Sequence, residues 1–317
     1  MKITVLGGGG VRSPFLAKSL ISNAERVGLT EIVFMDSNEE KLNIYGKIAE
    51  KIAEKINPGI KFWLTSDPVA ALKDANFIIT TIRVGEDKAR VLDERIALNN
   101  GILGQETTGA GGFAMSLRSI PKILEYCKMI EQYSAEGAML FNFTNPSGIV
   151  TQAIHLSGFK NVYGICDAPS EFIKQVAKVL EKPLEEVSAE CFGLNHLSWF
   201  RNIKVNGKDA MEELLAKKEL YTETEMKFFD PELVKISGNL LLNEYLYYFY
   251  YREKAEKAIM NSEKTRGETI LEINKQMTKE LKEVDIDKDA DKAFEIYMRN
   301  YMKRENSYME IESKTEK

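Results

Sequence analysis

A run of glycines near the start of the chain constrains the fold more than any other feature. Residues 7–10 are all glycine, and they separate an apolar segment at residues 3–6 from a helix-forming segment at residues 14–23. Glycine lets the backbone turn sharply and lets another group approach the main chain closely. The start of the following helix offers free N–H groups and the positive end of its dipole. This order of strand, glycine turn and helix predicts the opening of a Rossmann-type α/β domain.

The cofactor that such a loop would bind is indicated by Asp36. Gly7 and Gly9, with Gly8 between them, fit the dinucleotide fingerprint G-x-G-x-x-G, whereas Arg12 stands where the third glycine is usual. Asp36 ends the second predicted strand, where a carboxylate binds the ribose hydroxyls of NAD and repels the 2′-phosphate of NADP. The alternatives are a glycine-rich turn without a ligand and an aspartate that caps the next helix. We predict that NAD binds at Gly7, Gly8, Gly9 and Asp36.

The first half of the chain alternates short apolar runs with segments of helical periodicity. Helices are predicted at residues 14–23 and 39–55, and strands at residues 3–6, 31–35, 61–64, 77–82, 138–143 and 161–165. This alternation predicts a parallel sheet with helices on both faces. Residues 191–205 mix strand-like and loop-like character, and the chain is mostly helical after about residue 210. We predict an NAD-binding Rossmann-type domain at residues 1–193 and a mostly helical α+β substrate domain at residues 194–317.

The composition argues against several other classes of protein. The 317 residues are 44% hydrophobic and 29% charged, which is ordinary for a globular protein. The net charge is -5 and no basic stripe is present, so a nucleic-acid partner is not expected. The sequence has no apolar run long enough for a membrane span and no recognisable signal peptide. Three scattered cysteines do not form a disulfide framework, so a reducing cytoplasm is expected.

Cys166 and His196 are candidates for holding a metal ion. Cys166 follows the predicted strand at residues 161–165, at the carboxyl end where α/β sites lie. His196 lies in the string GLNHLSW, and the pair forms no C-x-x-C or H-x-x-x-H pattern. A Cys–His pair with open coordination positions could hold a divalent ion that also binds substrate oxygens. An inert buried cysteine and a structural histidine are the alternatives.

A series of short strings occurs in order along nearly the whole chain. They are GGG at 7–9, IRVG at 82–85, GQETTGAGG at 104–112, NFTNPSG at 142–148, GICD at 164–167, GLNH at 193–196, YLYY at 245–248 and TRGE at 265–268. Together these strings resemble those of family 4 glycoside hydrolases, in particular the 6-phospho-glucosidases. The resemblance implies NAD and Mn²⁺, or another divalent metal, as cofactors, because members of this family depart from the usual pair of catalytic carboxylates.

The resemblance also implies roles for four residues in the chemistry. Cys166 and His196 would bind the metal, and Tyr245 would take the proton from C2 of the sugar. Asp167 matches the general acid of members that cleave α-linkages, whereas members that cleave β-linkages often have Asn there. Tyr245 lies among other tyrosines, so a packing role is its alternative.

Four further residues would contact the substrate if the resemblance holds. Arg90, Asn145 and Arg266 would hold the 6-phosphate or the sugar hydroxyls, and Glu106 would line the pocket near the metal. The alternative for Arg90 is a solvated helix face, because it lies in a charged run. Arg266 could simply precede a helix.

The implied activity is hydrolysis of 6-phospho-glucosides by oxidation, elimination, addition and reduction, with a 6-phospho-α-glucosidase favoured by Asp167. The alternatives are a 6-phospho-β-glucosidase, an NAD-dependent 2-hydroxy-acid dehydrogenase with His196 as its base, and a non-catalytic NAD-binding fragment. The expected partners are a phosphorylated disaccharide or glucoside and further copies of the chain in a dimer or tetramer, with no nucleic acid and no membrane. Family members continue past the string at residues 304–308, so a truncated substrate domain is expected.

Overall fold

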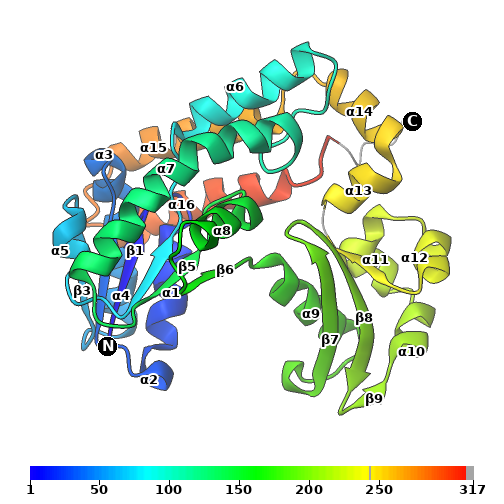
Figure 1. Cartoon of the computed structure of the whole chain (residues 1–317), viewed down its shortest axis with the longest axis horizontal. Coiled ribbons are helices and arrows are strands. Elements are labelled where there is room, and N and C mark those ends of the chain that lie inside the picture. Colours follow the sequence, from blue (N-terminus) through cyan, green and yellow to red (C-terminus); the bar gives the residue numbers. More distant parts are fainter. Residues whose placement is uncertain (243, 312–317) are drawn as a thin grey trace. The chain divides into compact units, whose positions relative to one another are not determined.

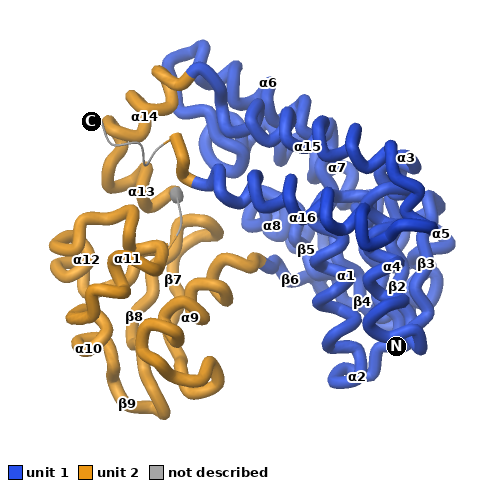
Figure 2. The backbone as a smooth tube through the Cα atoms, turned by 180° about the vertical axis from the view of Figure 1, so that it is seen from behind, with its two compact units in different colours: residues 1–165, 263–308 blue, residues 166–262, 309–317 orange. Residues whose placement is uncertain are grey.

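The computed structural model describes residues 1–242 and 244–311, and the chain forms two compact units (Figure 2). The first unit comprises Met1–Ile165 and Glu263–Tyr308, and the second comprises the described residues of Cys166–Ser262 and of 309–311. This division falls after Ile165 and Ser262, whereas the predicted domain boundary falls after residue 193. The predicted assignment of residues 1–193 and 194–317 to two domains stays a prediction.

The first unit is built on the parallel sheet that the alternating sequence predicts. Its strand order is β3-β2-β1-β4-β5-β6 (Figure 1). The strands are β1 (Lys2–Leu6), β2 (Glu31–Met35), β3 (Lys61–Thr65), β4 (Phe77–Thr80), β5 (Met139–Asn142) and β6 (Val162–Gly164). Leu6 pairs with Met35 on one side and with Thr80 on the other, so the strand order reverses at β1. Ligands of open α/β sheets bind at the carboxyl ends of strands beside such a switch point.

Helices cover both faces of this sheet. One face packs against Ala17 and Ile21 of α1 (Ser13–Ser22) and against Ala49 and Ala53 of α4 (Lys47–Ile56). The predicted helix at residues 39–55 is one helical run, in which α3 (Glu39–Lys41) and a π-helical turn (Leu42–Gly46) precede α4.

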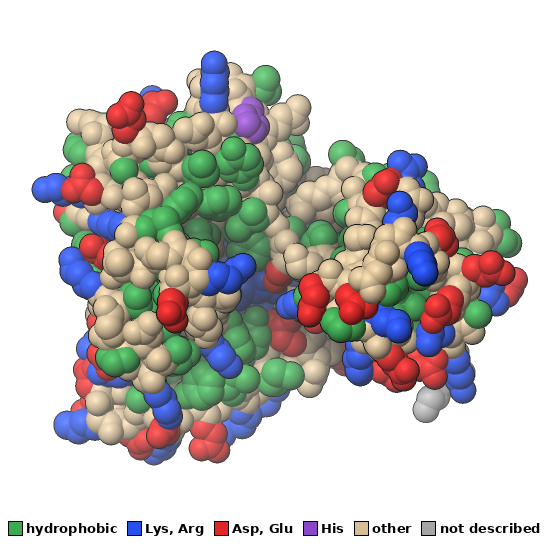
Figure 3. Space-filling model, turned by 90° about the horizontal axis from the view of Figure 1, so that it is seen from below, with side chains coloured by type: hydrophobic (Ala, Val, Ile, Leu, Met, Phe, Trp, Pro, Cys, Tyr) green, Lys and Arg blue, Asp and Glu red, His purple; other side chains and the backbone are tan. Residues whose placement is uncertain are grey.

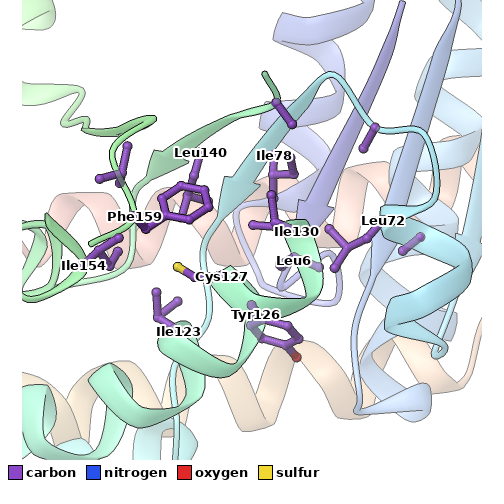
Figure 4. Close-up of a cluster of buried hydrophobic side chains, with 14 of the residues drawn as sticks. Leu6, Leu72, Ile78, Ile123, Tyr126, Cys127, Ile130, Leu140, Ile154 and Phe159 are labelled. Atoms are coloured by element: carbon purple, nitrogen blue, oxygen red, sulfur yellow. The ribbon is translucent and has the colours of Figure 1, made fainter. Parts of the chain in front are cut away.

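The opposite face of the sheet packs against α5 (Pro68–Leu72), α7 (Gly109–Tyr133) and α8 (Ser147–Leu156). Figure 4 shows the core on this face, where Ile123 and Ile130 of α7 approach Leu6, Ile78 and Leu140 of the strands. Successive side chains of each strand point to opposite faces of the sheet, and both faces are covered by a hydrophobic core. This explains why the strands are apolar at almost every position.

The first unit also contains α6 (Glu86–Asn99), α15 (Arg266–Lys282) and α16 (Ala290–Asn306). Met277 and Leu281 of α15 share a hydrophobic cluster with Tyr297 of α16 and Tyr45 of the π-helical turn. The Tyr297 hydroxyl also donates a hydrogen bond to the Val11 carbonyl, at 2.9 Å. The two helices near the end of the chain therefore pack beside the glycine loop at its start.

The second unit is a small α+β structure. Its antiparallel sheet contains β7 (Val187–Leu194), β8 (Leu197–Val205), β9 (Lys208–Asp209) and β10 (Leu240–Leu242). Residues 191–205, expected to be part loop, therefore lie almost wholly in a β-hairpin. The helices are α9 (Ala168–Val179), α10 (Met211–Ala216), α11 (Leu220–Glu223), α12 (Pro231–Ser237), α13 (Glu244–Tyr250) and α14 (Arg252–Met260). Three short helices complete the described chain: α2 (Ala24–Val27) in the first unit, and the 3₁₀ turns Leu184–Glu186 and Glu225–Phe228 in the second.

The surface carries charges of both signs. Lys and Arg lie interspersed with Asp and Glu on the face drawn in Figure 3, and hydrophobic side chains gather on part of the first unit. Met139, Tyr163 and Ile165, at β5 and β6, are among the exposed hydrophobic residues of that unit. Within the described residues, no helix has the length and apolar character needed to cross a bilayer.

Candidate functional site

The glycine loop is a tight turn between β1 and α1. The N–H groups of Gly7 and Gly8 both donate to the Met35 carbonyl, at 2.8 Å. Gly7 has a φ of 103°, in the left-handed region that favours glycine. A Cβ atom on Gly8 would lie 2.5 Å from the Cβ of Phe34, so the loop can lie this close to β2 only without a side chain.

Asp36 is held directly beside this loop. Its Oδ2 accepts a hydrogen bond from Gly9 N at 3.0 Å, and its Oδ1 accepts from Asn38 N at 2.9 Å. Burial raises the pKa of the Asp36 carboxyl, and the two backbone N–H groups oppose that rise. The next helix is capped by Asn38, whose side chain accepts from Lys41 N, so the alternative of Asp36 as the helix cap is wrong. NAD binding by this group stays a prediction.

Arg90 lies inside the first unit and not on a solvated helix face. It is 5% exposed, although α6 is rich in charged residues. Its Nε donates to Glu94 Oε1 at 2.8 Å, and its Nη1 lies 2.8 Å from Glu106 Oε2. Burial alone would lower the pKa of Arg90, but the two carboxylates outweigh it and raise that pKa.

Glu106, in the segment between α6 and α7, is the acidic centre of an arginine cluster. Arg83 and Arg90 both form ion pairs with its carboxylate. Burial alone would raise the pKa of Glu106, but these two cations outweigh it and hold that pKa far below its ordinary range. Arg83 Nη1 is buried and has no hydrogen-bond partner in the described part of the chain.

Arg304 of α16 adds a further positive charge to this cluster. Burial lowers the pKa of Arg304, and repulsion from Arg12 and Arg83 lowers it further. Arg304 forms no ion pair with any residue in the ranges 1–242 and 244–311. Arg304 is therefore a buried cation that has no described carboxylate within ion-pair distance.

Arg266 is the first residue of α15. Thr265 caps this helix by accepting from Glu268 N, and the Glu268 side chain accepts from Thr265 N at 2.9 Å. The Arg266 guanidinium donates from Nη1 to the Ser307 carbonyl at 2.5 Å and lies 5.3 Å from the ring of Tyr308. The side chain of Arg266 is thereby directed toward the turn that follows α16.

Asn145 lies in the loop between β5 and α8, immediately before Pro146, with which it forms a cis peptide bond. The buried Asn142 organises this loop. Its Nδ2 donates to the Thr144 and Ser147 carbonyls, each at 3.3 Å, and its Oδ1 accepts from Thr80 Oγ1 at 2.9 Å. These hydrogen bonds tie the loop of Asn145 to the carboxyl ends of β4 and β5.

In the second unit, Cys166 and His196 come together as the metal prediction requires. Cys166 Sγ lies 3.8 Å from His196 Nε2. Metal–sulfur and metal–nitrogen bonds of about 2.3 Å and about 2.1 Å allow donors at this separation to bind one ion. The described residues contain no group of three or more His, Cys, Asp and Glu side chains arranged to hold a metal. A metal held by this pair would therefore keep open positions for substrate oxygens.

His196 occupies a costly backbone conformation. It is the second residue of the turn that joins β7 to β8, and its φ is 64°. Such hairpin positions usually carry Gly, Asn or Asp, because a larger side chain is strained there. The strained position keeps the imidazole beside Cys166, which is the kind of backbone strain found at functional sites.

Tyr245 and Asp167 lie close to this pair. The ring of Tyr245, on α13, is 4% exposed and stacks against His196 with centroids 5.3 Å apart. Asp167 Oδ1 lies 4.0 Å from Cys166 Sγ. The second unit therefore gathers all four residues to which the resemblance assigns metal binding or proton transfer.

Sequence reasoning did not single out Glu94, Arg83 or Arg304. Arg83 and Arg90 each stand four residues before an acidic residue on or beside α6, a spacing that indicates ion pairs on a helix. That spacing is equally common on exposed helices, so it does not reveal burial. Arg304 carries no such signal in the sequence.

Two family models match the chain. The model for the family 4 glycosyl hydrolases matches residues 2–182, and that for their C-terminal domain matches residues 191–313. Among relatives, a probable 6-phospho-beta-glucosidase of Bacillus subtilis is 36% identical over 87% of this chain. The phospho-alpha-glucosidase PagL of Clostridium acetobutylicum is 33% identical over 88% of this chain.

Solved structures agree with these matches. A 6-phospho-beta glucosidase from Thermotoga maritima, solved with manganese, NAD⁺ and glucose-6-phosphate, superposes with a TM-score of 0.79 and 31% identity. That match covers 89% of this chain and 66% of the other. The chain spans 65% of the Bacillus relative and 66% of the Clostridium relative. The resemblance inferred from the sequence strings is confirmed, and the chain belongs to family 4 of the glycosyl hydrolases.

Proposed function

We propose that this protein hydrolyses 6-phospho-glucosides with the help of NAD and a divalent metal ion. The observation that carries the proposal is the grouping of Cys166, His196 and Tyr245 in a family 4 chain, with 3.8 Å between Sγ and Nε2 and the tyrosine ring against the imidazole. Relatives named for both α- and β-linked substrates support the substrate class. The chain spans less than two thirds of the Bacillus relative, so the activity of the whole protein is part of the proposal.

The cofactors would be held by residues that fit them. Gly7, Gly8 and Gly9 form the tight turn before α1, where a pyrophosphate would bind, and Asp36 would accept hydrogen bonds from the ribose hydroxyls. Cys166 and His196 would hold the metal, and the manganese in the Thermotoga structure supports Mn²⁺. When bound, NAD⁺ accepts a hydride from C3 and the metal acts as a Lewis acid toward the sugar oxygens.

Tyr245 and Asp167 would move the protons. Tyr245 would take the C2 proton at its phenolic oxygen, which requires a fixed position, and burial against His196 supplies one. Asp167 would protonate the glycosidic oxygen as the aglycone leaves. A carboxylic acid at this position favours the 6-phospho-α-glucosidase, with the 6-phospho-β-glucosidase as the alternative.

The 6-phosphate or the sugar hydroxyls would be bound by Arg90, Asn145 and Arg266. Arginine binds phosphate well, because its planar fork of N–H donors matches the oxygen atoms. Glu106 would line the pocket near the metal, and its carboxylate would also hold Arg83 and Arg90 in place. The protein would act on a phosphorylated disaccharide or glucoside in the cytoplasm, as a homo-oligomer.

The test is hydrolysis of α- and β-linked nitrophenyl glucoside 6-phosphates, with NAD and Mn²⁺ added or withheld. We expect nitrophenol release that needs both cofactors, with the α-linked substrate preferred and no net change in NADH. Absence of hydrolysis with both cofactors present would refute the proposal. Oxidation of NADH by a keto acid would instead indicate a 2-hydroxy-acid dehydrogenase. A protein that binds NAD, needs no metal and hydrolyses neither substrate would be non-catalytic.

A further inference from the structure

We propose that Glu94 is a positioning residue that fixes Arg90 and Arg266 for the same phosphate group. The inference rests on the proposed function, since it takes a sugar phosphate as the ligand. Glu94 is 1% exposed and lies on α6, where the sequence indicates only a charged helix. Its carboxylate connects Arg90 of α6 with Gly267 of α15, which are far apart in the sequence.

Both carboxylate oxygens of Glu94 accept hydrogen bonds. Oε1 accepts from Arg90 Nε at 2.8 Å, and Oε2 accepts from Gly267 N at 2.8 Å. A carboxylate this deeply buried is tolerated only when its charge is paired and its lone pairs accept hydrogen bonds. Here a guanidinium supplies the charge, and the start of α15 supplies a free N–H group at the positive end of its dipole.

The first consequence concerns the orientation of Arg90. A guanidinium has five N–H donors in one plane. Glu94 accepts a hydrogen bond from Nε and Glu106 forms an ion pair with Nη1, so two carboxylates hold the group from two sides. Apart from that ion pair, the edge formed by Nη1 and Nη2 makes no hydrogen bond or ion pair with any described residue. This edge has the geometry that binds two oxygens of one phosphate.

The second consequence concerns the start of α15. Arg266 is followed directly by Gly267, whose N–H group binds Glu94. One residue further on, Glu268 forms an ion pair with Arg95 of α6. The first turn of α15 is thus attached to α6 at two points, and the main chain of Arg266 is fixed relative to Arg90.

Glu94→Gln tests the charge of this residue. A neutral amide has one acceptor oxygen where the carboxylate has two, so either Arg90 or Gly267 loses its partner. Hydrogen bonds to charged groups are typically strong enough that losing one lowers an affinity about tenfold to a hundredfold. We expect such a loss in glucose 6-phosphate affinity.

Gly267→Ala tests the same contact from the other side and keeps the charge. A Cβ atom on Gly267 would lie 2.5 Å from Glu94 Oε2, so the end of that side chain must shift. Alanine is a better helix former than glycine, so α15 itself should not be weakened. The matched control is Asp93→Asn, which removes a charge from the neighbouring buried carboxylate that pairs with Arg118 of α7.

The experiment is calorimetric titration of glucose 6-phosphate into protein that contains NAD and Mn²⁺, for wild type, Glu94→Gln, Gly267→Ala and Asp93→Asn. We expect the affinity to fall about tenfold or more in the first two variants, and to be unchanged in Asp93→Asn. NAD affinity should be unchanged in all three variants, and in hydrolysis KM should rise in Glu94→Gln and Gly267→Ala with little change in kcat.

Wild-type affinity for glucose 6-phosphate in both Glu94→Gln and Gly267→Ala would overturn the inference, and so would an equal loss in Asp93→Asn. If Glu94→Gln does not fold, Gly267→Ala decides alone. A wild-type protein that binds no glucose 6-phosphate would refute the proposed function itself, and the inference with it. The two failures are therefore distinguishable.

Discussion

Replacing Gly8 by alanine should displace the glycine loop and weaken both the first unit and its affinity for NAD. A Cβ atom there would lie 2.5 Å from Phe34 Cβ and 2.9 Å from Phe34 Cα. Carbon atoms in contact are normally about 3.5–4.0 Å apart. Phe34 is fully buried in β2, and neither atom is the end of a flexible side chain, so the loop or the strand must move.

The size of the effect follows from this overlap. Overpacking of a well-packed core typically costs about 1–3 kcal/mol. For a domain of roughly two hundred residues, each kcal/mol lowers the unfolding midpoint by about 2–4 °C. We therefore expect Gly8→Ala to lower the midpoint by about 2–12 °C. NAD should bind more weakly too, because a shifted loop moves the Gly9 N–H group away from Asp36.

Gly10→Ala is the matched control for this experiment. A Cβ atom there would meet Gly7 O at 3.2 Å and otherwise only side-chain oxygens at 3.8 Å or more. The assay is thermal unfolding with and without NAD, together with an NAD titration of both variants. Equal midpoints and equal NAD affinities in Gly8→Ala and Gly10→Ala would refute the argument that the loop needs a bare backbone against Phe34.

Four further predictions concern single residues of the candidate site. Asp36→Ala should weaken NAD binding about tenfold or more, since hydrogen bonds to a charged acceptor are lost; an unchanged affinity in an NAD titration would contradict the assignment. Cys166→Ser should lower Mn²⁺ affinity in a metal titration and leave NAD affinity intact, and equal Mn²⁺ binding would remove Cys166 from the metal site. Asp167→Asn should cost about 10²–10⁴-fold with a sugar leaving group and little with nitrophenolate, so equal losses in the two hydrolysis assays would exclude Asp167 as the acid. The pKa of Glu106 is held below its ordinary value of 4.5, so its ion pairs stabilise the protein above that pH and are lost as the pH falls toward the folded-state pKa. Urea unfolding between about pH 5 and about pH 3 should thus show a shallower acid loss of stability in Glu106→Gln, and identical pH profiles would count against the pairing.

The parallel sheet could be predicted from the sequence because its strands are buried on both faces. Such strands are apolar at nearly every position, and turn residues separate them from the helices. The predicted strand at residues 77–82 ends earlier, at Thr80, where Thr81 turns toward the glycine loop and donates to the Gly7 carbonyl. The ends of strands at a ligand site are set by such local contacts, which periodicity does not reveal.

The place of α15 and α16 could not be predicted from the sequence. Helical periodicity shows that one face of each helix is buried, but it does not show which element covers that face. Their partners are Tyr45 and Ile48, more than two hundred residues earlier in the chain. The hairpin of β7 and β8 was obscured for another reason, because His196 occupies the turn position where a glycine or asparagine would have been the usual signal.

The burial of α6 and its neighbours is the most informative difference between the sequence and the structure. A charged run such as the one around Arg90 normally lies on a solvated face, because burying ions costs free energy that their pairing scarcely repays. Here Arg90 forms ion pairs with both Glu94 and Glu106. Arg83 forms ion pairs with Glu106 and Asp87, whereas the buried Arg304 forms none with a described residue. Burying an arginine without a carboxylate partner is costly for folding, and a bound anion would offset that cost. The 6-phosphate of the proposed substrate is an anion of the required chemistry, so substrate binding explains why Arg304 is buried without a carboxylate partner.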